Sequence, residues 1–234
     1  MIQTLLNINP ALNITISVLL LIISYLLGSI PFGVIIGKKL KGIDIREHGS
    51  KNIGSTNAIR VLGKKIGFLV FFCDVFKGMA IIILVKVLSA TGLWVTPIEE
   101  LYYGAAAIIG HSYSIFLDFK GGKAVATSLG VVLILSPLVA ILCLIAFYIA
   151  LKITGYVSVA STCATITVVS GGWVLFFIGI NPTNFLEYFI GKVSLPLALL
   201  FSLMGLLIII KHIKNYKRLI NGTENSFKKK KETN

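Results

Sequence analysis

Long apolar stretches separated by short polar segments constrain this chain more than any other feature. Residues 1–37 carry no charged side chain, and further apolar runs follow almost to the C-terminus. A helix needs about 20 apolar residues to cross a bilayer. There are seven runs, at residues 14–36, 66–89, 101–116, 124–136, 137–151, 156–180 and 193–210. We therefore predict an all-α, polytopic membrane protein with about seven transmembrane helices.

The composition argues against other broad classes. Charged residues make up 13% of the chain, whereas soluble domains carry about 25%. So little charge cannot cover a soluble globule of this length. The cysteines, Cys73, Cys143 and Cys163, lie inside apolar runs, and their spacing fits neither a disulfide framework nor a metal site. We expect them to pack as small apolar side chains.

The basic residues that give the chain its formal net charge of +13 lie in clusters. Of the 22 Lys and Arg residues, all but three lie at residues 38–65, at 120–123, at Lys152 or after residue 210. Basic clusters mark the cytoplasmic ends of membrane helices. Seven spans with the N-terminus outside place every cluster, and the C-terminus, on the cytoplasmic side. We predict one membrane domain over residues 1–218, followed by a basic cytoplasmic tail over 219–234.

Residues 124–151 leave two possibilities open. Their 28 residues are too many for one straight span and too few for two full ones, and Pro137 favours a break. The segment forms either one broken helix or two short helices. We prefer two, because one span would place Lys152 outside.

The first of three polar clusters covers residues 47–60. It contains Ser50, Asn52, Asn57 and Arg60 among several glycines. Glycine lets the backbone approach a ligand, Ser and Asn offer neutral hydrogen bonds, and Arg offers a fork for phosphate or carboxylate. This composition favours a binding site over a plain connecting loop.

The second cluster contains His111 and the sequence Lys120-Gly121-Gly122-Lys123 before a predicted helix. Backbone N–H groups at a helix N-terminus and nearby lysines attract anions. The spacing differs from that of a Walker A loop. The alternative is a tight turn whose lysines serve only the topology.

The third cluster follows the last apolar run. His212 and Asn215 share one helix face at a spacing of three residues. A basic helix next to the membrane explains the lysines here, but it requires neither this pair nor Glu224. Deeper in the second apolar run, Asp74 and Lys77 are also three residues apart. A lone charge at that depth costs about 2.5–3.5 kcal/mol, so we expect them to pair and either brace the site or line it.

Together these clusters resemble the PlsY family, the bacterial glycerol-3-phosphate acyltransferases that use acyl phosphate. The resemblance spans about residues 25–227. It rests on Ser50-Lys51-Asn52-Ile53-Gly54-Ser55-Thr56-Asn57, Asp74, Lys77-Gly78, Gly110-His111, Phe119-Lys120-Gly121-Gly122-Lys123, His212, Asn215, Arg218 and Gly222-Thr223-Glu224. The family usually has Gly, Pro and Gly where this chain has Lys51, Ser114 and Ala124.

The resemblance implies a reaction. An acyl chain would pass from acyl phosphate to the 1-hydroxyl of glycerol 3-phosphate, giving lysophosphatidic acid and phosphate. Such an enzyme lies in the bacterial inner membrane, with its active site facing the cytoplasm and membrane lipid around it. The resemblance also implies functional coupling to the enzyme that makes acyl phosphate. No cofactor, metal ion or nucleic acid is implied.

The resemblance also assigns roles to residues. Ser50, Arg60, His212 and Asn215 would be catalytic. The resemblance places substrate binding at Lys120, Gly121, Gly122 and Lys123, and we expect Asn52, Asn57 and His111, polar residues of the same clusters, to bind substrate as well. Structural roles would fall to Asp74, Lys77 and Glu224.

Several alternatives stay open from the residues alone. His212, His111 or a phosphate oxygen of the substrate could accept the proton from the attacking hydroxyl. Ser50 could orient a substrate or act as a nucleophile, and we favour the first. A competing function is anion transport, but transport predicts polar residues deep in several spans, and here polarity is one-sided. The His-x-x-x-x-Asp pattern of acyltransferases that use acyl-CoA or acyl-carrier protein is absent.

Overall fold

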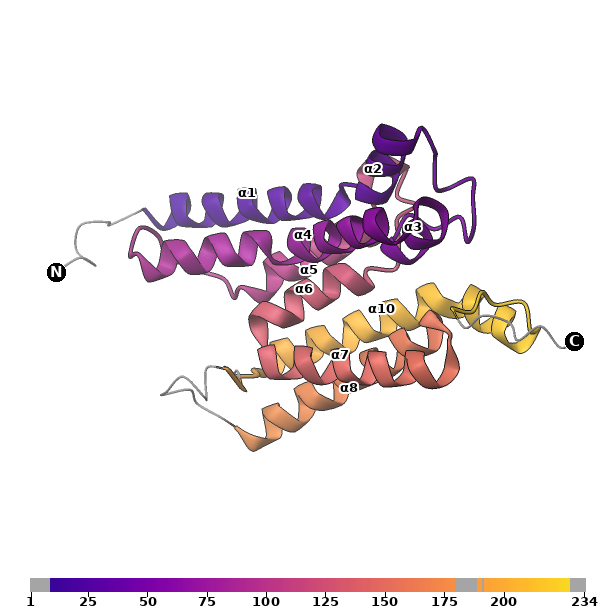
Figure 1. Cartoon of the computed structure of the whole chain (residues 1–234). Coiled ribbons are helices and arrows are strands. Elements are labelled where there is room, and N and C mark those ends of the chain that lie inside the picture. Colours follow the sequence, from indigo (N-terminus) through magenta and orange to yellow (C-terminus); the bar gives the residue numbers. More distant parts are fainter. Residues whose placement is uncertain (1–8, 180–188, 191, 228–234) are drawn as a thin grey trace, which may run out of the picture. The chain divides into compact units, whose positions relative to one another are not determined.

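The computed structural model describes residues 9–179, 189–190 and 192–227 (Figure 1). Every regular element within these residues is helical, which confirms the predicted all-α class. The chain divides into two compact units, Met1–Leu135 and Ser136–Asn234.

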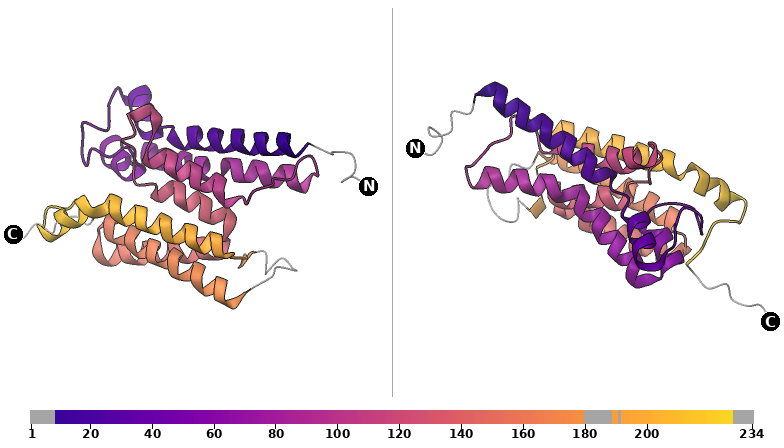
Figure 2. Two further views of the ribbon diagram at one scale, coloured as in Figure 1. Left: turned by 180° about the vertical axis from the view of Figure 1, so that it is seen from behind. Right: turned by 90° about the horizontal axis from the view of Figure 1, so that it is seen from above.

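The first unit is built around one long helix. Its helices are α1 (Pro10–Ser29), α2 (Phe32–Lys41), α3 (Ser55–Leu62), α4 (Lys64–Ala90), α5 (Leu101–Ser112), the short 3-10 helix η1 (Ile115–Leu117) and α6 (Val125–Leu135). Helix α4 packs against each of the other five α-helices (Figures 1 and 2). Side chains borne by α4 are therefore able to connect several elements.

Glycines bring α4 and α6 unusually close. A Cβ atom on Gly78 of α4 would run into the carbonyl of Thr127, and one on Gly130 of α6 would run into the carbonyl of Val75. Small residues at a helix interface let the backbones approach in this way in membrane proteins. The contact fixes the start of α6, where one of the polar loops ends.

The helix predicted over residues 14–36 is wrong in its extent. The chain forms α1 and then α2, separated at Ile30 and Pro31. Proline has no N–H group and disfavours the helical conformation in the residue before it, and Ile30 has an extended ψ of 118°. The break exposes the carbonyl of Ile30 to other partners.

The second unit contains α7 (Pro137–Thr154), α8 (Val157–Ile178) and α10 (Leu195–Ile220). Helix α8 packs against both α7 and α10 (Figure 1). Residues 124–151 thus form two helices, α6 and α7, separated at Ser136. Gly155 ends α7 in the left-handed conformation, with φ at 79°, and so permits the tight turn into α8.

The predicted boundary between membrane domain and tail, at residue 218, stays a prediction; α10 itself continues to Ile220. The segment after α10 then folds back on its own unit. The N–H of Phe227 donates to the carbonyl of Gly155 at 2.8 Å. The residues directly after 218 therefore belong to the folded unit.

Five of the described helices are long and apolar enough to cross a membrane: α1, α4, α7, α8 and α10. Helices α5 and α6 have 12 and 11 residues, below the lower limit of about 17 for a full span. The seven spans and the orientation of the termini stay predictions.

Asp74 and Lys77 form an ion pair inside α4. Both side chains are about 3% exposed, and Nζ of Lys77 lies 2.8 Å from Oδ1 of Asp74. The same Nζ donates to the freed carbonyl of Ile30 at 2.8 Å and lies 5.6 Å from the centre of the Phe32 ring. On the other side, Nδ1 of His111 lies 3.7 Å from Oδ1 of Asp74. The pair thus connects α4 with the α1–α2 junction and with α5.

Replacing Lys77→Met tests this connection, because methionine keeps much of the apolar stem and removes the charge. The buried carboxylate of Asp74 then loses its cation, which costs about 3–5 kcal/mol. We expect the midpoint of thermal unfolding in detergent to fall by roughly 6–20 °C. The double variant Asp74→Asn/Lys77→Met removes both charges and recovers part of the loss. An unchanged midpoint in Lys77→Met would show that the pair does not brace the fold.

Candidate active site

Asn57 organises the polar loop that leads into α3. Its side chain is 1% exposed, and its Oδ1 accepts the N–H of Ser50 at 2.8 Å. Its amide nitrogen lies 2.8 Å from the carbonyl oxygen of Ile45, 2.9 Å from that of Asn52 and 3.1 Å from that of His48. One buried amide therefore fixes the backbone on both sides of Ser50. The contact of Asn57 with substrate stays a prediction.

Ser50 is half-buried and is held through its backbone. None of the residues that the structure describes accepts or donates a hydrogen bond at its hydroxyl, whereas a nucleophilic serine needs an adjacent base. Next along the loop, Oδ1 of Asn52 accepts the N–H of Gly54 at 3.0 Å, which turns the chain into α3. Arg60 lies one helical turn after Asn57 and is half-buried.

His111 holds the second polar loop. Its carbonyl accepts the N–H of Gly122 at 2.9 Å. A Cβ atom on Gly122 would run into the His111 ring, and one on Gly121 would run into its carbonyl. Both positions therefore require glycine. Since His111 also approaches Asp74, the loop is connected to the ion pair in α4.

Two of the three departures from the family pattern occupy backbone that glycine suits best. Lys51 has a φ of 58° and Ala124 a φ of 57°, in the left-handed region that disfavours side chains. The third departure, Ser114, has a φ of −67°, which proline also adopts. The buried Ser114 hydroxyl donates to the carbonyl of Ser29 at 2.6 Å, a bond that proline cannot make.

The two loops meet at an open cleft within the first unit. Its volume is about 390 Å³, and it is lined by Arg46, Lys51, Asn52, Ile53, Leu117, Asp118, Lys120 and Gly121. Of the predicted residues, Asn52, Lys120 and Gly121 line it. Eight others in the same unit do not: Ser50, Asn57, Arg60, His111, Gly122, Lys123, Asp74 and Lys77. The structure thus brings two separate polar clusters to one place.

The cations of the cleft differ in how they are engaged. Arg46 donates from Nη2 to Oδ2 of Asp44 at 2.7 Å, and Nζ of Lys38 lies 3.1 Å from the same oxygen. Hydrogen bonds from Arg46 hold the pKa of the Asp44 carboxyl well below its usual value. In contrast, neither Lys51 nor Lys120 forms an ion pair with any residue that the structure describes. No acidic side chain among the described residues therefore neutralises these two lysines.

The third polar cluster belongs to the second unit, where Glu224 gathers three donors. Its carboxylate accepts from Asn215 at 2.7 Å, from Nε of Arg218 at 2.8 Å and from the hydroxyl of Ser158 at 3.3 Å. The side chain of Glu224 is 3% exposed. These bonds attach the segment after α10 to both α10 and α8.

His212 is 2% exposed on α10. Its Nδ1 lies 2.8 Å from the carbonyl of Ile208, and because a carbonyl only accepts, Nδ1 carries the proton in this bond. The ring stacks on Tyr216 with centroids 6.1 Å apart. The orientation of the imidazole is therefore fixed, whereas the catalytic roles of His212 and Asn215 stay predictions.

Several lining residues were not expected as site residues from the sequence. Arg46, Leu117 and Asp118 lie outside the polar clusters and Lys51 and Ile53 lie inside the first one, and only the fold brings them to the cleft. Within residues 9–179, 189–190 and 192–227, no three His, Cys, Asp or Glu side chains gather as a metal site requires.

Comparison with known proteins places the chain. Residues 18–222 match the family model for glycerol-3-phosphate acyltransferase. The glycerol-3-phosphate acyltransferase of Acholeplasma laidlawii is 44% identical over 221 residues, covering 92% of this chain and 94% of the relative. That of Desulfotalea psychrophila is 44% identical over 212 residues, covering 89% and 97%.

Solved structures agree. Crystal structures of PlsY, an integral membrane glycerol 3-phosphate acyltransferase, in its glycerol 3-phosphate and lysophosphatidic acid forms are each 39% identical to this chain. Each alignment covers 90% of this chain and 95% of the solved chain, with TM-scores of 0.74 and 0.72. The chain therefore belongs to the glycerol-3-phosphate acyltransferase family and is an integral membrane enzyme.

Proposed function

We propose that the enzyme transfers an acyl group from acyl phosphate to the 1-hydroxyl of sn-glycerol 3-phosphate. The products are lysophosphatidic acid and phosphate, and the step is the first acylation of phospholipid synthesis. The supporting observation is the cleft of the first unit, where a glycine-rich loop and an asparagine-rich loop present lysines without acidic partners among the described residues. Similar solved proteins carry glycerol 3-phosphate and lysophosphatidic acid.

The cleft suits the phosphate of glycerol 3-phosphate. Lys120 supplies charge, and the N–H of Gly121 has no hydrogen-bond acceptor among the described residues. Charge-assisted hydrogen bonds of this kind are about twice as strong as neutral ones. Ile53 and Leu117 provide apolar walls beside the polar groups, against which the carbon chain of glycerol can rest. Arg60 and Lys123 stay proposed phosphate ligands on the strength of the family resemblance.

We expect this acyl transfer to proceed without a covalent acyl-enzyme intermediate. The 1-hydroxyl oxygen bonds to the acyl carbon, the bond from that carbon to phosphate breaks, and the hydroxyl proton passes to a base. Positioning and charge stabilisation supply much of the rate when phosphate is the leaving group. No histidine lines the cleft, which favours a phosphate oxygen over His111 as the proton acceptor. His212 stays a candidate.

We further propose that Ser50 orients a substrate by a hydrogen bond. Oδ1 of Asn57 accepts the N–H of Ser50, and this bond fixes the backbone that bears the Ser50 hydroxyl. The site lies on the cytoplasmic face of a bacterial inner membrane, in keeping with the basic loops. Acyl phosphate then arrives with its chain in the bilayer and its head group at the loops, supplied by the enzyme that makes it.

The acyl donor is tested with purified protein in detergent. We expect release of inorganic phosphate from acyl phosphate that depends on glycerol 3-phosphate, with formation of lysophosphatidic acid. Acyl-CoA in place of acyl phosphate should give no product. Product formation from acyl-CoA alone would overturn the proposed donor.

The anion site is tested by Lys120→Ala, with Lys123→Ala measured beside it. Losing a charge-assisted hydrogen bond to phosphate should raise KM for glycerol 3-phosphate roughly tenfold. Lys39→Ala is the matched control, because Lys39 is exposed on α2 and does not line the cleft. Equal KM values in Lys120→Ala and the control would make the cleft lysine a topology signal only.

Ser50→Ala distinguishes the two roles of this serine. The bond that holds the loop uses the N–H of Ser50, which alanine retains, so the unfolding temperature should stay unchanged while kcat falls. The wild-type enzyme incubated with labelled acyl phosphate alone should carry no acyl group by intact mass. A hydroxylamine-sensitive adduct that disappears in Ser50→Ala would identify a nucleophile instead.

A further inference from the structure

Lys51 brings a cation to left-handed backbone, a conformation that glycine adopts more readily than any other residue. Its backbone has a φ of 58°, a conformation that costs an L-residue about 1–2 kcal/mol. The surrounding loop holds it there. The N–H of Lys51 donates to the carbonyl of His48 at 3.0 Å, and Asn57 binds that same carbonyl. A side chain in such backbone persists because its surroundings over-determine it, and residues of this kind gather at functional sites.

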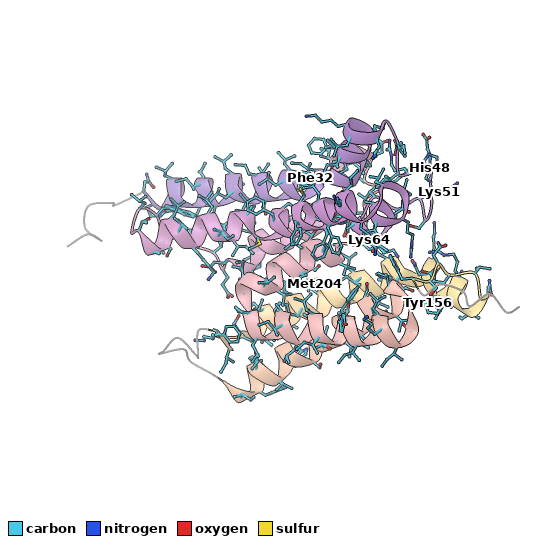
Figure 3. The ribbon with its side chains drawn as sticks, in the orientation of Figure 1. Phe32, His48, Lys51, Lys64, Tyr156 and Met204 are labelled. Carbon is cyan, nitrogen blue, oxygen red and sulfur yellow. The ribbon has the colours of Figure 1, made fainter. Side chains whose placement is uncertain are left out.

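The side chain of Lys51 lies at the cleft. Figure 3 marks Lys51 and His48 on the loop that follows α2, while Lys120 reaches the same cleft from the loop after η1. Lys51 has no ion-pair partner among the described residues, whereas Arg46 is engaged by Asp44. The two lysines therefore face one space from two different loops.

The cleft also has a carboxylate, that of Asp118. Its charge opposes the entry of an anion, and a single lysine would only cancel it. Lys51 and Lys120 together leave the cleft cationic even before Arg46 is considered. A phosphate with two negative charges matches two ammonium groups better than one.

We propose that Lys51 is a second phosphate-binding lysine, which contacts the phosphate of glycerol 3-phosphate together with Lys120. This inference rests on the function proposed for the cleft. Lys51 thereby adds affinity for a doubly charged substrate, and the bound phosphate connects the two loops. The Lys51 side chain is exposed, so its packing does not offset the cost of the backbone conformation, which the hydrogen bonds of the surrounding loop maintain.

Lys51→Gly separates the two effects, because it removes the ammonium group and relieves the backbone. We expect KM for glycerol 3-phosphate to rise about five- to tenfold, with a much smaller change in kcat. The unfolding temperature of the ligand-free protein should rise by roughly 2–4 °C. A residue that only supports the loop would give the opposite change in unfolding temperature.

Two further variants isolate the charge. Lys51→Gln keeps the strained backbone and loses the ammonium, so KM should rise as in Lys51→Gly while the unfolding temperature stays near that of the wild type. Lys51→Arg keeps the charge and should show the smallest rise in KM of the three. Binding of glycerol 3-phosphate by calorimetry, without acyl donor, should show the same order of affinities.

The reference variant Lys120→Ala distinguishes this inference from the proposed function. If Lys120→Ala raises KM but Lys51→Gly and Lys51→Gln do not, the role of Lys51 is refuted and the cleft stands. If the calorimetric affinity falls in none of these variants, the cleft itself is refuted as the phosphate site. A parallel rise in KM for Lys120→Ala, Lys51→Gly and Lys51→Gln supports both.

Discussion

The buried ion pair of Asp74 and Lys77 is the interaction on which the first unit depends. It lies in the helix that every other α-helix of the unit contacts. Lys77 binds the carbonyl that the proline break at Ile30 leaves open, and Asp74 approaches His111. His111 in turn packs against Gly121 and Gly122 of the second polar loop. A charge pair that is costly inside a membrane therefore positions the loop that lines the cleft.

At the cleft, neutral groups hold the backbone in place, and the lysines are left to interact with a ligand. The amide of Asn57 shapes one loop, and the His111 carbonyl holds the other. With the backbone fixed in this way, Lys51 and Lys120 need no acidic partner to hold them in place. Cations without an acidic partner among the described residues suit the binding of an anionic substrate. The basic residues that indicate the orientation of the chain thus include those proposed to bind its substrates.

The sequence predicts much of this fold, because apolar runs and basic clusters report directly on membrane helices. Pro31 was an available signal for the break between α1 and α2, yet the apolar run across it favoured one helix. The sequence does not predict that Asn57 fixes the loop, since this depends on three carbonyls that only the folded loop brings together. The same holds for Arg46 and Asp118 at the cleft. Motif resemblance locates the loops, but it does not say which of their residues face the same space.

Everything proposed for this enzyme requires the phosphate of glycerol 3-phosphate to bind in the cleft between the two loops. A crystal structure of this protein, from crystals grown in lipid with glycerol 3-phosphate, would locate the bound phosphate. We expect the phosphate within hydrogen-bond distance of both Lys51 and Lys120, with the N–H of Gly121 directed at it. A phosphate bound elsewhere, with the cleft occupied by solvent alone, would contradict it.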